Sequence, residues 1–157
     1  MTTQRAPDAV TDEPLSKSRL RLWLKLLKAS KLVEDDVRRR LRDQHRSTLP
    51  RFDVMSALYR YPDGLKMSEI SGLLRVSNGN ITGIVDRLTD EGIALRVAIP
   101  GDRRASLVKL TPKGVKSFSA QAEEHESWID SLFANFDADE IDTISTLLDR
   151  LNTTDKT

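Results

Sequence analysis

The chain has 157 residues, 38% of them hydrophobic, with no cysteine and two histidines. It is long enough to bury a core, while the lack of cysteine excludes disulfides and thiol chemistry, and a zinc site would need carboxylates to complete it. The net charge of +1 hides an asymmetry, because residues 119–157 carry ten acids and two bases, whereas residues 1–118 carry 23 bases and 14 acids. The basic part would suit a polyanion, unless its charges only solvate long helices.

The first fourteen residues are polar and include Pro7 and Pro14, without the apolar core of a signal peptide. No apolar run approaches the ~18 residues that a membrane span needs. We therefore expect a cytoplasmic protein with a flexible arm over residues 1–15, a short tail over residues 153–157, no membrane association and no cofactor.

Apolar residues keep a helical spacing from Ser16 to about Arg46, which predicts one long helix. Thr48-Leu49-Pro50 predicts the start of a second helix, and the turn sequence "YPDG" ends it. The next residues, "LKM", are too few for more than one bridging strand.

Two short helices with a tight link come next. Ser68 is expected to cap the helix "SEISGLLR", and Ser77 to cap "SNGNITGIVDRLTDEG", whose Gly92 suits the left-handed position just past a helix end. This pattern predicts a helix-turn-helix.

The alternating stretch "IALRVAI", the turn "PGDRR" and the return "SLVKL" predict a β-hairpin, or wing, packed on the helix-turn-helix. Thr111-Pro112 opens another helix, and apolar spacing continues from Phe118 to Phe136. Asp137 is placed to cap a last helix. We expect these terminal helices to form a seam with a partner subunit.

From about residue 17 to residue 152, this order of elements resembles the MarR family of winged-helix transcriptional regulators. The wing carries the specific part of the resemblance, since the family pattern Asp-x-Arg, five residues, Leu-Thr-x-x-Gly is matched without a gap. The matching residues are Asp102, Arg104, Leu110, Thr111 and Gly114. The resemblance implies a mainly α fold with a small β-hairpin wing: a winged helix-turn-helix over residues 48–111, and a homodimer formed by helices in residues 16–47 and 112–152.

A helical wheel of residues 77–90 places Ile81, Ile84, Val85 and Leu88 on the buried face. Gly79 and Gly83 point outward, where each glycine costs about 0.5–1 kcal/mol relative to alanine. Close approach of the backbone to the major groove of DNA would explain them; a plain surface helix is the alternative. The candidate DNA-contacting residues of this helix are Ser77, Asn78, Gly79, Asn80, Thr82 and Arg87.

Arg103 and Arg104 lie at the tip of the expected wing, where an arginine can enter a narrow minor groove. By resemblance, Arg104 is the groove arginine and Asp102 holds its guanidinium in place. The alternative is a purely structural ion pair.

Trp23, His45, Arg46 and nearby arginines lie on or near the first long helix, and the family usually has its ligand cavity close to the end of that helix. Such a site would suit a small anionic aromatic effector. In the alternative, Trp23 and Trp128 belong to the core and the arginines to the solvated surface.

The sequence contains no serine nucleophile elbow, phosphate-binding glycine loop or metal cluster, which argues against an enzyme. We predict a regulator that binds double-stranded DNA, acting as a repressor released from an inverted-repeat operator by an aromatic acid or its thioester. A winged-helix module for chromosome architecture or protein contacts, without an effector, is the alternative.

Overall fold

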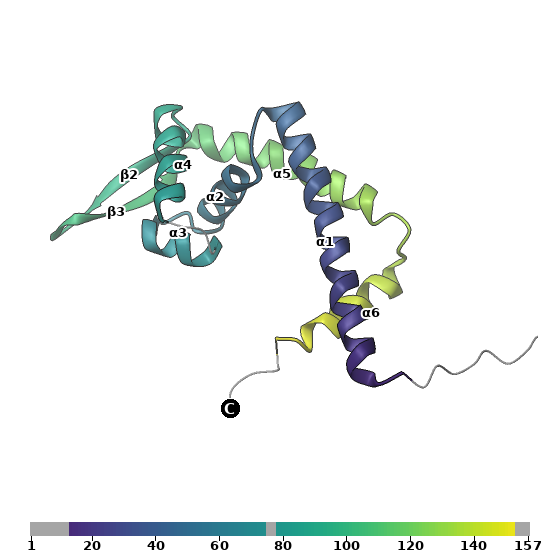
Figure 1. Ribbon diagram of the computed structural model, residues 1–157. Coiled ribbons are helices and arrows are strands. Elements are labelled where there is room, and N and C mark those ends of the chain that lie inside the picture. The colour runs from purple at the N-terminus through teal and green to yellow at the C-terminus, as the bar shows by residue number, and fades with distance from the viewer. Residues whose placement is uncertain (1–12, 75–77, 153–157) are drawn as a thin grey trace, which may run out of the picture. The chain divides into compact units, whose positions relative to one another are not determined.

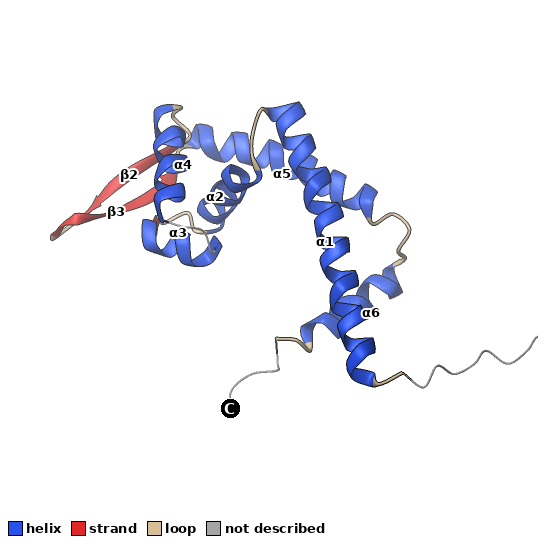
Figure 2. Cartoon of the chain, viewed as in Figure 1, coloured by secondary structure: helices blue, strands red, loops and turns tan. Residues whose placement is uncertain are grey.

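The computed structural model describes residues 13–74 and 78–152 (Figure 1). Its elements, in chain order, are α1 (Leu15–His45), α2 (Leu49–Arg60), β1 (Leu65–Lys66), α3 (Met67–Leu74), α4 (Asn78–Asp90), β2 (Ala94–Ile99), β3 (Asp102–Leu110), α5 (Pro112–Leu132) and α6 (Ala138–Asp149). Most of the chain is helical, and the strands gather in one small sheet (Figure 2). The chain divides into two compact units between Asp36 and Val37, within α1.

The described part of the N-terminal unit contains the beginning of α1. Arg21 forms an ion pair with Glu13, with 2.5 Å between the guanidinium nitrogen and the carboxylate oxygen. The apolar side chains at helical spacing in this part are exposed in the single chain: Leu20, Trp23, Leu24 and Leu27. This part of α1 therefore keeps an apolar face without burying it within its own chain.

The core of the second unit lies between α2, α3, α4 and the sheet. Thr48 caps α2 by accepting a hydrogen bond from the backbone N–H of Arg51 at 3.2 Å, and Pro50 lies in the first turn, as the sequence predicts. The fully buried large side chains come from α1 to β3: Leu41, Val54, Met55, Leu58, Ile70, Ile81, Val85, Leu88 and Val108.

The sheet has the strand order β1-β3-β2, and both pairings are antiparallel. β1 is the expected bridging strand, pairing Leu65 with Val108. β2 and β3 form the expected hairpin, with Ala94 opposite Leu110 at its base and a register shift after Ala98 near its tip. The hairpin extends away from the helices of this unit, as a wing does (Figure 1).

Two expectations about helix ends are wrong. Ser68 does not cap α3, because the helix follows β1 directly and begins at Met67; the side chain of Glu69 instead accepts the backbone N–H of Lys66 at 3.0 Å. Phe136 is not on α5, which ends at Leu132. The expected cap of Ser77 lies outside the described residues.

One residue of the expected seam along α5 is placed elsewhere. Phe118 is buried within its own chain, with ring centroids 5.4 Å from Phe52 and 5.0 Å from Tyr59. It therefore belongs to the core that joins α2 to α5. Asp137 caps α6 as predicted, in a reciprocal capping box with Glu140.

Candidate nucleic-acid interface

One face of α4 is apolar. The opposite face is exposed and nearly bare, because it carries the two glycines Gly79 and Gly83. Ile81, Val85 and Leu88 are fully buried, which confirms this part of the helical wheel, and Ile84 is half-buried. Gly79, Asn80, Thr82 and Gly83 are exposed on the first half of the helix, and Arg87 is exposed on the second half. Ser77 and the side chain of Asn78 lie outside the described part of the structure.

The two glycines of the bare face are not required by packing within the chain. A Cβ atom built on Gly79 or Gly83 would meet no heavy atom within 4 Å, and both residues have ordinary helical backbone. Since helical glycine is less favourable than alanine by about 0.5–1 kcal/mol, the intrachain structure gives no reason for either residue. A reason would be the close approach of this surface to a binding partner.

The end of α4 is closed by a Schellman motif. The N–H of Gly92 donates to the carbonyl of Thr89 at 3.1 Å, and the N–H of Ile93 donates to the carbonyl of Leu88 at 2.8 Å. Gly92 has a φ of 73°, the left-handed backbone predicted from the sequence. The chain then turns directly into β2, so the direction of the wing is set from the end of α4.

The wing tip differs from expectation in one contact. Asp102 Oδ1 accepts a hydrogen bond from the backbone N–H of Arg104 at 3.0 Å, so the carboxylate braces the backbone and not the guanidinium. Gly101 takes a φ of 86° in the turn, and the Arg104 side chain is exposed. The side chain of Arg103 is outside the described part of the structure. Arg104 can therefore point away from the hairpin while its backbone is fixed.

An ion pair that sequence reasoning missed joins α4 to the wing. Arg96 of β2 lies 2.6 Å from Asp86 of α4, measured from the guanidinium nitrogen to the carboxylate oxygen. Asp86 is on the exposed side of α4, where an unpaired carboxylate would repel phosphate groups. The pair offsets that charge at the point where helix and wing meet. The only sequence signal was an acid and a base ten residues apart.

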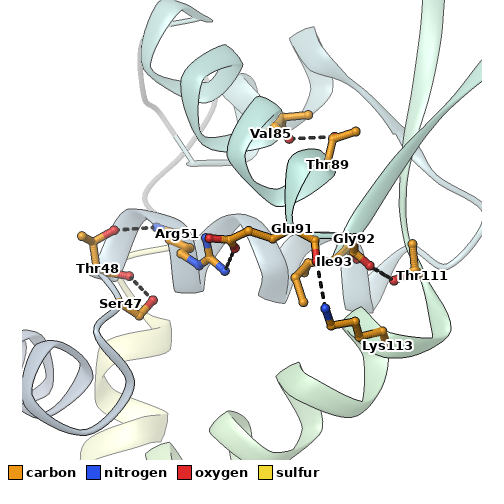
Figure 3. A network of polar contacts seen from close by, with 10 residues as sticks. All are labelled: Ser47, Thr48, Arg51, Val85, Thr89, Glu91, Gly92, Ile93, Thr111 and Lys113. Atoms are coloured by element: carbon orange, nitrogen blue, oxygen red, sulfur yellow. Dashed lines mark hydrogen bonds and ion pairs between the residues drawn. The ribbon is translucent and has the colours of Figure 1, made fainter.

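The base of the wing is tied to the start of α5 (Figure 3). Thr111 Oγ1 donates to the carbonyl of Gly92 at 2.6 Å, and the Thr111 N–H donates to the carbonyl of Ile93 at 3.0 Å. Thr111 Oγ1 also accepts the N–H of Gly114 at 3.0 Å and so caps α5. One threonine thus fixes both the wing base and the first turn of α5, which explains why the motif contains it.

The three residues considered for a ligand site are not gathered into one pocket by any described contact. Trp23 is 54% exposed and lies in the N-terminal unit. His45 lies in the second unit, where its Nε2 is 2.8 Å from a carboxylate oxygen of Glu124. Arg46 is exposed, with a left-handed φ of 49° just after α1. The assignment of these residues to a pocket remains a prediction.

His45 is also part of a series of rings between α1, α2 and α5. Its ring centroid is 6.1 Å from that of Trp128, which is buried. The series continues through His125, Phe52, Phe118 and Tyr59, with neighbouring centroids 4.8–6.5 Å apart. Burial of Trp128 agrees with the core alternative for that residue.

The surface of the second unit has several grooves, two of them with volumes of about 800 Å³ and about 560 Å³. The first, between α5 and α6, includes three carboxylates, Glu123, Glu126 and Asp130, which disfavour an anion. The other lies where the end of α2 meets the end of β3 and the start of α5. It is lined by Leu58, Tyr59, Arg60, Pro62, Leu110 and Val115. This second groove combines apolar walls, an aromatic ring and one cation.

Within residues 13–74 and 78–152, no group of three or more His, Asp or Glu side chains is placed to hold a metal ion. No helix in that same part of the chain is both long and apolar enough to cross a bilayer.

A short helix pair, a bare second helix, and a hairpin carrying an exposed arginine together define a winged helix-turn-helix DNA-binding protein. The comparisons identify the family. The sequence pattern of the MarR family matches residues 47–106. A MarR family transcriptional regulator from Silicibacter pomeroyi, known from its crystal structure, is 32% identical, with a TM-score of 0.73 over 92% of this chain and 100% of that one. The chain belongs to the MarR family and is a DNA-binding transcriptional regulator.

The chain is also similar to two further proteins. The HTH-type transcriptional regulator MhqR of Bacillus subtilis is 24% identical over 137 residues, which cover 87% of this chain and 93% of that protein. A mutant of MarR from E. coli, solved in complex with operator DNA, has the same fold, with a TM-score of 0.71 at 24% identity over 88% of this chain and 99% of that one.

Proposed function

We propose that the protein is a repressor that binds, as a homodimer, an operator made of two inverted half-sites. The observation that carries this proposal is that each chain has one exposed α4 face beside one wing, and the wing presents the exposed Arg104. One such head reads one half-site, and a two-fold dimer places two heads about one helical turn apart, ~10–10.5 bp centre to centre. A mutant of E. coli MarR, which has the same fold, has been solved in complex with operator DNA.

The exposed apolar faces of the terminal helices support the dimer. None of the residues of α6 is buried in the single chain, although Ile141, Ile144, Leu147 and Leu148 follow one helical face. An amphipathic helix with an exposed apolar stripe requires a partner, since most helical stability comes from burying that stripe. The exposed apolar face of α1 is a second surface of the same kind.

Footprinting and sedimentation test the dimer and the operator together. The expected result is one protected, two-fold symmetric site in the DNA flanking the coding region, occupied by a dimer that is already present at micromolar concentration. A monomer that protects a single half-site would contradict the proposal. Broad protection without a discrete site would favour the architectural alternative.

We also propose that a small anionic aromatic compound, such as an aromatic acid or its thioester, releases the operator. The groove that includes Tyr59 and Arg60 supports an aromatic acid, because the ring can pack on its apolar walls while the guanidinium binds the carboxylate. The contacts of Trp23, His45 and Arg46 with such a ligand stay part of the proposal. By linkage, a ligand that prefers a dimer with wrongly spaced α4 helices weakens DNA binding by the factor by which DNA weakens ligand binding.

A further inference from the structure

Glu91 lies between the end of α4 and the start of the wing, and it contacts the first turn of α2 and the first turn of α5 (Figure 3). Its carboxylate oxygen is 2.5 Å from the Arg51 guanidinium in the first turn of α2. Its backbone carbonyl accepts a hydrogen bond from Lys113 Nζ, in the first turn of α5, at 3.0 Å. A single residue thus contacts two helices that are far apart in sequence.

In the part of the chain that the structure describes, the backbone after α4 is hydrogen-bonded to α5 and not to α2. The carbonyls of Glu91, Gly92 and Ile93 all accept hydrogen bonds from residues 111–113. These three carbonyls fix the end of α4 to α5, but they do not fix it to α2. Among the described residues, the side chain of Glu91 makes the polar link from this corner to α2, where it binds the half-buried Arg51.

We infer that Glu91 and Arg51 are positioning residues for DNA recognition: their ion pair sets the direction in which α4 and the wing leave the rest of the head. This inference rests on the proposed role of α4 as the helix that reads the operator. Gly79 lies at the end of α4 opposite Glu91, and Gly83 lies near the middle, so a small rotation at the corner displaces both glycines and moves Gly79 further. The Glu91 side chain is 53% exposed, and a glutamine in its place can still accept a hydrogen bond from Arg51, so Glu91→Gln has little effect on stability.

The loss of a negative charge and the loss of helix positioning change the operator affinity in opposite directions. Measuring that affinity therefore distinguishes the two effects. Glu91→Gln removes a negative charge from a DNA-binding head, so long-range electrostatics would strengthen binding. Asp90→Asn removes the same charge one residue earlier and is the matched control. If the ion pair positions α4, Glu91→Gln weakens operator binding by about 3- to 10-fold relative to Asp90→Asn.

The probe is the duplex fragment found by footprinting, compared with a scrambled duplex of the same length. We expect Glu91→Gln to lose affinity for the operator and to bind the scrambled duplex as tightly as Asp90→Asn does, with an unchanged melting temperature. Arg51→Glu should also weaken operator binding, and the double variant Arg51→Glu/Glu91→Arg should recover most of it, because the pair is restored with the net charge unchanged.

Equal operator affinities for Glu91→Gln and Asp90→Asn, measured with a wild-type protein that does discriminate the two duplexes, would overturn the inference and leave the proposed function standing. A wild-type protein that does not discriminate them would overturn the proposed function, and this inference with it.

Discussion

A Cβ atom on Gly114 would lie 2.0 Å from the carbonyl oxygen of Ile93. The first turn of α5 therefore rests directly against the backbone at the base of the wing, and only glycine allows this approach. The same carbonyl accepts the N–H of Thr111, so contact and hydrogen bond hold the two segments together. This packing gives the glycine of the wing motif a structural reason.

Gly114→Ala is expected to destabilise the protein by about 1–3 kcal/mol, because the added methyl group must displace either α5 or the wing base. The free energy of unfolding in urea measures this. The helix propensity of alanine acts in the other direction, so a variant as stable as the wild type would contradict the close approach.

Gly83→Ala has the opposite expected effect on stability. The new methyl group meets open space and alanine favours the helix, so the free energy of unfolding should rise by about 0.5–1 kcal/mol. Operator affinity should fall, because the methyl group separates α4 from the groove. Gly72→Ala is the control. Gly72 is an exposed residue of α3, and a Cβ atom there also meets open space, so this substitution should add stability without changing operator affinity. If Gly83→Ala binds the operator as tightly as the wild type does, the backbone of α4 does not come close to the DNA at this residue.

Arg104→Ala should weaken operator binding and flatten the preference for A·T-rich flanking sequences, because an arginine at a wing tip reads the width of the minor groove. Arg87→Ala should instead lower affinity evenly across sequences, as expected of a phosphate contact. Titrations with varied flanks measure both. An Arg104→Ala protein with the wild-type affinity and flank preference would indicate that the wing arginine is structural.

Ile144→Glu should convert the proposed dimer to a monomer, since it places a charge in the exposed apolar stripe of α6. Sedimentation velocity at micromolar concentration measures the change. Thr146→Glu adds the same charge away from the stripe and should leave the dimer intact. Dimers of equal stability for both variants would place the partner surface elsewhere.

Arg60→Gln should reduce the affinity for an aromatic acid by about tenfold or more, because it removes a charge-assisted hydrogen bond. A panel of aromatic acids and their thioesters, followed by gel shift and tryptophan fluorescence, first identifies a ligand. A Trp23→Phe protein then reports on buried Trp128 alone. The pocket lies beside His45 instead if two results are found together: Arg60→Gln has the wild-type affinity for the ligand, and His45→Gln has a lower affinity.

The sequence by itself determined the features whose causes lie within a few neighbouring residues. The caps formed by Thr48, Thr111 and Asp137, the left-handed Gly92 and the buried face of α4 follow from local hydrogen bonding and helical periodicity. The family assignment also followed from a short motif, because that motif encodes local structure at the wing base.

Only the tertiary structure decided which distant groups meet. The pairs Arg51 with Glu91 and His45 with Glu124 are separated by 40 and 79 residues, and no local pattern specifies them. Phe118, placed on a partner-facing seam by its spacing, is buried under α2 because periodicity identifies an apolar face but not what covers it. Such contacts depend on how helices pack, and packing is set by the shapes of many side chains together.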